Sequence, residues 1–115
     1  MCESCGCDGS QMEPSSRTEL RSMVDYTDDG VVSRTLMDKE AGSVTLFAFD
    51  AGQSLSEHTT PYDALVQVIE GEVELSIGGE EVRAEAGELV LMPADVPHAV
   101  SAPQKFKMLL TMIRS

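Results

Sequence analysis

Residues 68–79, Val-Ile-Glu-Gly-Glu-Val-Glu-Leu-Ser-Ile-Gly-Gly, decide the fold class of this chain. From residue 73 to residue 77 apolar and polar side chains alternate, which is the pattern of a strand with one buried face. The glycine at position 71 interrupts the apolar run before it, and Gly78-Gly79 favours a tight hairpin. The stretch therefore predicts the end of one strand, a second strand and a hairpin turn.

Similar short segments extend in both directions from this stretch. They are rich in Val, Leu, Ile, Phe and Met, and they lie at 31–37, 43–50, 63–70, 82–85, 89–92, 99–102 and 106–113. Gly, Pro and Asp separate them at intervals of about 8–12 residues, a spacing typical of a sandwich or barrel. No helical pattern of convincing length follows residue 30. The sequence therefore predicts an all-β domain.

The length of 115 residues fits one domain with one core. With three Phe, two Tyr and no Trp, that core is expected to be mainly aliphatic. Residues 1–16 are rich in Gly, Ser and Cys and predict a flexible tail, which leaves 17–115 for the barrel domain. No apolar run approaches the roughly 20 residues that span a bilayer, and residues 1–11 do not resemble a secretory signal. We therefore expect a cytoplasmic protein.

The chain is strongly acidic, with a formal net charge of −12. Phosphate groups are bound mainly through Lys and Arg, so this charge disfavours nucleic acid as a partner. An anionic membrane is disfavoured for the same reason. The simplest interpretation of the acidity is solubility.

The segment from Gly52 to Gly71 keeps the spacing of a motif of the form G-x5-H-x-H-x3-E-x6-G. His58 occupies the first histidine position, whereas Thr60 and Ala64 stand at the second histidine and the glutamate. The segment resembles the first of the two motifs of the cupin superfamily. The spacing is kept throughout, although two of the three ligand types are replaced.

The segment from Gly87 to Ala102 resembles the second cupin motif, G-x5-P-x-G-x2-H-x3-N. Pro93 and His98 match it, and Asp95 stands where the motif has glycine. The resemblance covers about residues 43–113 and is greatest to the small single-domain, RmlC-like cupins. It implies a double-stranded β-helix, that is, a jelly-roll cupin barrel with one pocket.

Metal-binding cupins use three histidines and one glutamate, so the resemblance implies that His58 and His98 are two of four metal ligands. The metal would be a divalent transition ion such as nickel, zinc, iron or manganese. Two imidazoles are fewer than the three or four protein ligands of a usual site. The alternative is a metal-free pocket in which the two imidazoles hydrogen-bond each other or water.

Strand alternation predicts the rest of the pocket lining. If Ala64 and His98 face inward, so do the residues two and four positions further along each strand. The predicted lining is Thr60, Tyr62, Ala64, Val66, Val68, Met92, Val100 and Ala102. These side chains suit a small, partly apolar ligand of unknown identity. The alternative is that Phe47, Phe49, Met92 or Met108 fill the space.

The chain begins with three closely spaced cysteines, Cys2, Cys5 and Cys7, in the pattern C-x2-C-G-C. This segment resembles the N-terminus of the GTPase that helps to insert nickel into hydrogenases, and the resemblance implies capture of nickel, zinc or copper by thiolates. No phosphate-binding loop is present, so no nucleotide chemistry is implied. The alternative is an exposed tail that is sensitive to oxidation.

The function best supported by the sequence is binding of a small molecule or metal by a homodimeric cupin without defined catalytic activity. The alternative is a metal-dependent cupin enzyme, an oxygenase, isomerase or lyase, that uses His58 and His98. No clear acid–base pair replaces the missing ligands. A further hypothesis is assembly of a dimer through pairing of the apolar strand at 106–113.

Overall fold

The computed structural model describes residues 12–114, which form nine strands and one 3₁₀ helix. The elements are η1 (Leu20–Met23), β1 (Val31–Lys39), β2 (Gly42–Phe49), β3 (Ser54–His58), β4 (Asp63–Glu70), β5 (Glu72–Ile77), β6 (Glu80–Glu85), β7 (Leu89–Met92), β8 (His98–Ser101) and β9 (Phe106–Ile113). Every strand predicted from the sequence is present, within a few residues of its expected bounds. β3 is additional, because its segment carries only one apolar side chain, Leu55.

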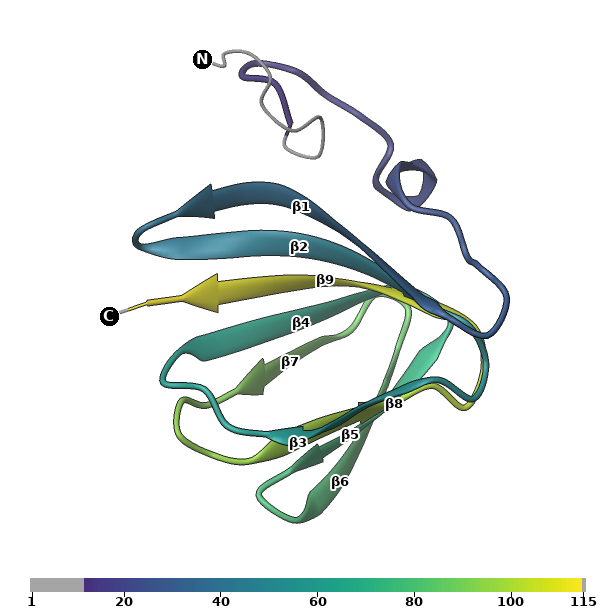
Figure 1. The fold of residues 1–115 in the computed structure, drawn as a ribbon, viewed down its shortest axis with the longest axis vertical. Helices are drawn as coiled ribbons and strands as arrows, with labels where there is room; N and C mark the ends of the chain where they lie inside the picture. The colour runs from purple at the N-terminus through teal and green to yellow at the C-terminus, as the bar shows by residue number, and fades with distance from the viewer. Residues whose placement is uncertain (1–11, 115) are drawn as a thin grey trace.

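The strands form two antiparallel sheets that face each other, as Figure 1 shows. One sheet has the order β1-β2-β9-β4-β7 and the other has the order β3-β8-β5-β6. Strands that are distant in sequence are neighbours in both sheets, which is the topology of a jelly roll. The predicted all-β jelly-roll barrel is thereby confirmed.

The main core lies between the two sheets. Phe49 of β2 and Phe106 of β9 are fully buried, and their rings stack with centroids 4.6 Å apart. Val, Leu, Ala and Met side chains from both sheets surround the two rings, so the core is aliphatic around one aromatic pair. Burying each of these rings contributes on the order of 2–3 kcal/mol to folding.

A second cluster lies on the outer face of the five-stranded sheet. Leu46 and Ala48 point away from the barrel interior and are nevertheless fully buried. The segment that contains η1 covers them with Leu20, Met23 and Val24. Both faces of β2 are therefore buried, and residues from Leu20 onward belong to the packed domain.

Two polar contacts hold this N-terminal segment on the sheet. The hydroxyl of Tyr26 donates to the Glu70 carboxylate at 2.6 Å. The ammonium of Lys107, a buried residue, donates to the carbonyl of Arg21 at 2.7 Å and lies 5.0 Å from the centre of the Tyr26 ring. The aromatic ring thus lies between a carboxylate that accepts its proton and a cation that contacts its face.

The Tyr26 contact makes stability depend on pH in the alkaline range. Burial, followed by the hydrogen bond to Glu70 and the charge of that carboxylate, raises the pKa of Tyr26 above its usual value of 10.0. Because the pKa is higher in the folded state, the protonated Tyr26 hydroxyl stabilises the fold below about pH 10. This stabilisation is lost as the pH rises further. We expect Tyr26→Phe to be less stable than wild type by about 1 kcal/mol at neutral pH. Urea unfolding should show this difference shrinking above about pH 10, whereas a constant difference would contradict the assignment.

Candidate functional site

The neighbouring strands β3 and β8 bring His58 and His98 together. The two residues are paired across the strands, and their ring centroids lie 4.4 Å apart at an interplanar angle of 66°. The pairing depends on a β-bulge in β3. Leu55 pairs with Val100, and from this pair to the histidine pair there are three residues along β3 but only two along β8. In a regular strand His58, three residues after Leu55, would point to the opposite face from Leu55. The bulge therefore directs both imidazoles to one side.

The two histidines differ in burial but share one hydrogen-bonding pattern. His98 is 6% exposed, whereas His58 is exposed at the end of β3. The Nδ1 atom of His58 lies 2.9 Å from the carbonyl oxygen of Ser56, and that of His98 lies 3.3 Å from the carbonyl oxygen of Val96. A carbonyl oxygen only accepts, so each Nδ1 carries the proton and each Nε2 keeps its lone pair. Metal-binding histidines are oriented in the same way by contacts behind the ring.

The two replaced ligand positions provide no further donor at this point. Ala64 is buried in β4 with no polar side-chain atom. The hydroxyl of Thr60 contacts the backbone of Tyr62, at 3.3 Å from its carbonyl oxygen and 3.4 Å from its nitrogen. Within residues 12–114 no three His, Cys, Asp or Glu side chains lie together as a metal site. Within the part of the chain that the structure describes, the candidate donor groups here are therefore the two imidazoles.

The predicted lining residues fall into two groups. Six of them lie in the main core cluster between the sheets, namely Ala64, Val66, Val68, Met92, Val100 and Ala102. The same cluster contains Phe49, Phe106 and Met108, so large side chains share this part of the interior. Thr60 and Tyr62 are half-buried in the β3–β4 connection.

Cys2, Cys5 and Cys7 lie outside the described residues, so metal capture by that segment stays a prediction.

Hydrogen bonds join the β3–β4 connection to the β7–β8 loop, next to the histidine pair. The backbone nitrogen of Asp95 donates to the Thr60 carbonyl at 2.8 Å, and that of Ala94 donates to the Asp63 carboxylate at 2.9 Å. Asp95 adopts a φ of 65°, which lies in the left-handed region that favours glycine. This backbone conformation explains why the second motif has glycine at this position. Asp tolerates it better than most residues, so the loop keeps its shape.

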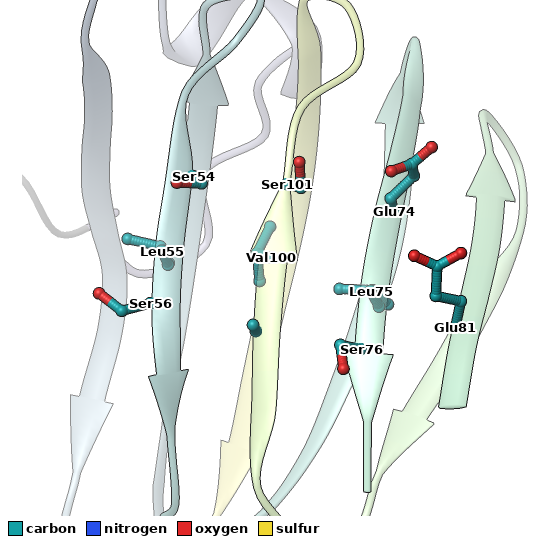
Figure 2. Close-up of a pocket in the computed structure, with 10 residues that line it drawn as sticks. Ser54, Leu55, Ser56, Glu74, Leu75, Ser76, Glu81, Val100 and Ser101 are labelled. Carbon is teal, nitrogen blue, oxygen red and sulfur yellow. The ribbon is translucent and has the colours of Figure 1, made fainter. Parts of the chain in front are cut away.

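A shallow depression of about 290 Å³ lies on the outer face of the four-stranded sheet (Figure 2). Its polar lining consists of Ser54, Ser56, Ser76, Ser101, Glu74 and Glu81. The hollow forms because short Ser and Ala side chains of β3 and β8 lie beside longer side chains of β5 and β6. Glu74 is paired with Arg83 of β6. This depression was not predicted from the sequence, although its small outward residues are visible in the strand alternation.

The fold and the site define a small jelly-roll barrel protein with a histidine pair on adjacent strands. The family model of the cupin domain matches residues 45–114, and the chain therefore belongs to the cupin family. The resemblance of the two spaced motifs is thereby confirmed at the level of family and fold.

Several solved structures are similar to this one. A conserved protein of unknown function from Streptococcus pyogenes is 34% identical, with a TM-score of 0.85 over 90% of this chain and 91% of that chain. A cupin 2 conserved barrel domain protein from Leptotrichia buccalis is 36% identical, with a TM-score of 0.80 over 83% of this chain and 46% of that chain. A cupin superfamily protein from Desulfitobacterium hafniense, at 23% identity, has a TM-score of 0.84 over 90% of this chain and 95% of that chain, and supports the fold alone. No curated protein matches the chain.

Within residues 12–114 no helix has the length and apolarity needed to cross a bilayer.

Proposed function

We propose that this protein binds a divalent transition metal ion through the Nε2 atoms of His58 and His98, together with a small molecule that supplies further donors. The observation that carries the proposal is that the Nδ1 atoms of both paired histidines contact backbone carbonyl oxygens. Each Nδ1 is engaged by a backbone carbonyl, so both free lone pairs belong to Nε2 atoms on paired residues. Neutral imidazole suits zinc, nickel, copper and iron.

The number of protein donors supports a combined metal and ligand site. A metal held by two imidazoles keeps at least two coordination positions for water or for a ligand. A small molecule with two oxygen donors fills adjacent positions and gains from chelation. The protein would then act as a binding module that holds the metal and the small molecule together.

A metal titration tests this proposal. We expect Cys2→Ser/Cys5→Ser/Cys7→Ser to bind about one Ni²⁺ or Zn²⁺ per chain, because the histidine pair is intact and thiolates cannot contribute. Adding His58→Ala/His98→Ala to the same background should weaken binding more than about 100-fold, since even the loss of an outer contact commonly weakens a site 10- to 100-fold. Isothermal titration calorimetry measures both affinities. Oxalate, a small molecule with two oxygen donors, should tighten metal binding to the variant that lacks only the three cysteines.

Thr60→Ala in the same background is the matched control. Its hydroxyl contacts the Tyr62 backbone, so its removal should leave the metal affinity within a few-fold of the parent. The electron paramagnetic resonance spectrum of bound Cu²⁺ should show coupling to two imidazole nitrogens. Equal metal content with and without the two histidines would contradict the proposal.

A further inference from the structure

The ring of His98 takes its orientation from a loop, whereas the ring of His58 takes it from its own strand. The Nδ1 atom of His98 lies 3.3 Å from the carbonyl oxygen of Val96, in the loop of residues 93–97 between β7 and β8. The Nδ1 atom of His58 lies 2.9 Å from the carbonyl oxygen of Ser56, inside β3. The His98 contact is longer than the usual range of about 2.7–3.2 Å, so a small shift of the Val96 carbonyl would break it. The orientation of His98 therefore depends on what holds the loop.

The β7–β8 loop has a backbone conformation that needs support. Asp95 has a φ of 65°, in the left-handed region, which costs free energy for a residue with a Cβ. The nitrogen of Asp95 donates to the Thr60 carbonyl at 2.8 Å, and the nitrogen of Ala94 donates to the Asp63 carboxylate at 2.9 Å. The loop and the β3–β4 connection lie side by side in Figure 1. Two adjacent nitrogens of the loop are thus held by the segment that follows His58.

Of these two contacts, only the one to Asp63 uses a side chain. Asp63 is the exposed first residue of β4, and its neighbour Ala64 is buried in the core, so the Asp63 side chain points outward. An N–H group forms a shorter and stronger hydrogen bond with an ionised carboxylate than with a neutral acceptor. Within residues 12–114 Asp63 takes part in no ion pair. The contact that the structure gives this carboxylate is therefore the one to the loop.

We propose that Asp63 is a positioning residue of the histidine site. Its carboxylate holds the Ala94 nitrogen, and the loop thereby keeps the Val96 carbonyl beside His98. That carbonyl keeps the proton of His98 on Nδ1 and leaves the lone pair on Nε2. The effect on metal affinity rests on the proposed function, whereas the effect on the ring does not. Contacts behind a metal ligand commonly change the affinity of a site roughly 10- to 100-fold.

Nitrogen-15 NMR of the imidazole rings tests the inference without metal, at about pH 8.5, where unperturbed imidazole is neutral. In the parent chain that lacks the three cysteines, His98 should give the shifts of the Nδ1–H tautomer. Asp63→Ala should move His98 to a mixture of the two tautomers, because the loop no longer holds the carbonyl in place. Asp63→Asn should restore the parent spectrum, since an amide oxygen accepts the same hydrogen bond. His58 is the internal control and should be unchanged in all three chains.

Calorimetry with Ni²⁺ in the same background measures the consequence for the site. Asp63→Ala should weaken Ni²⁺ binding about tenfold. Asp63→Asn should stay within a few-fold of the parent, although it has lost the negative charge. Asp25→Ala is the matched control, because it removes another exposed carboxylate, on the N-terminal segment, and should leave the affinity unchanged.

The inference and the proposed function fail on different results. A parent chain that binds no Ni²⁺, or that binds it equally without the two histidines, contradicts the proposed function, and the His98 tautomer then decides the role of Asp63. An unchanged His98 tautomer in Asp63→Ala would overturn the inference, as would an unchanged affinity in a parent that binds Ni²⁺. An Asp63→Asn chain that loses as much as Asp63→Ala would also overturn it, since charge and not the hydrogen bond would be responsible.

The test does not depend on a single variant. Asp63 is exposed and makes no ion pair within residues 12–114, so circular dichroism should show Asp63→Ala folded. If it does not, Asp63→Val takes its place with the same expected changes, because valine suits a strand and has no acceptor.

Discussion

Gly71→Ala is expected to destabilise the barrel by about 2–5 kcal/mol, the sum of a backbone term and a steric term. Gly71 has a φ of +79°, a conformation that L side chains rarely adopt. A Cβ at this position would lie 2.2 Å from the Lys105 carbonyl oxygen and 2.9 Å from the Phe106 Cα. Both are backbone atoms and cannot rotate away, so the start of β9 must shift. That shift disturbs the stacking of Phe106 on Phe49 in the core.

Gly87→Ala provides the matched control for this effect. Gly87 has a φ of +93°, but no heavy atom lies within 4 Å of a Cβ built there. The control should therefore show only the backbone term of about 1–2 kcal/mol. Urea unfolding at equilibrium measures both changes. Equal losses in the two variants would mean that close approach to β9 is not the reason for glycine at position 71.

Thr60→His/Ala64→Glu is expected to convert the proposed two-histidine site into a tight metal site. The substitutions restore the two ligand types that the first cupin motif has at these positions, giving four protein donors in place of two. We expect the affinity for Ni²⁺ or Zn²⁺ to rise more than about 100-fold, because added ligands replace bound water and a complete set holds metal strongly. Calorimetry in the Cys→Ser background measures the gain.

Stability provides a second measurement for the same variant. Ala64 is buried in an apolar cluster, so a glutamate there places an unpaired carboxylate in the core and destabilises the metal-free chain. Metal binding should restore the melting temperature, since a ligand that binds only the folded state stabilises it. If the double variant does not fold, Thr60→His alone should still gain about tenfold in affinity. Unchanged affinity in that chain would show that position 60 does not face the two histidines.

The strands themselves were largely predictable, but β3 was not. The segment Ser54–His58 has a single apolar residue and its side chains are mostly exposed, so it has no hydrophobic pattern. It is a strand because its backbone pairs with β8, whose paired residues lie 40 to 47 positions further along the chain. Local sequence patterns do not contain that information.

The alternation of side chains in β2 correctly predicts a strand, but it does not show which of its two faces points into the barrel. Phe47 and Phe49 face the barrel interior, whereas Leu46 and Ala48 face outward under the N-terminal segment. Both sets are apolar because both faces are covered. Which set is internal follows from the register with β1 and β9, not from composition.

The hypothesis that the strand at 106–113 pairs across a dimer is wrong for the residues described. β9 lies in the centre of its sheet, and both of its edges are hydrogen-bonded, to β2 and to β4. Its backbone therefore has no free edge for a second chain. Only its outward side chains remain available for contact with another chain.

The sequence by itself determined the all-β class, the cupin motifs and the two histidine positions, because turns, period-two alternation and motif spacing are local properties. The tertiary structure decided how the two histidine rings are placed and which apolar side chains stay exposed. A bulge in β3 directs His58 to the same side as His98, and backbone carbonyls fix both rings. The sheet order brings β1, β7 and β9 into one sheet, and with them the exposed side chains of Met37, Leu91 and Ile113. These features arise from contacts between residues far apart in the chain, and so no local pattern encodes them.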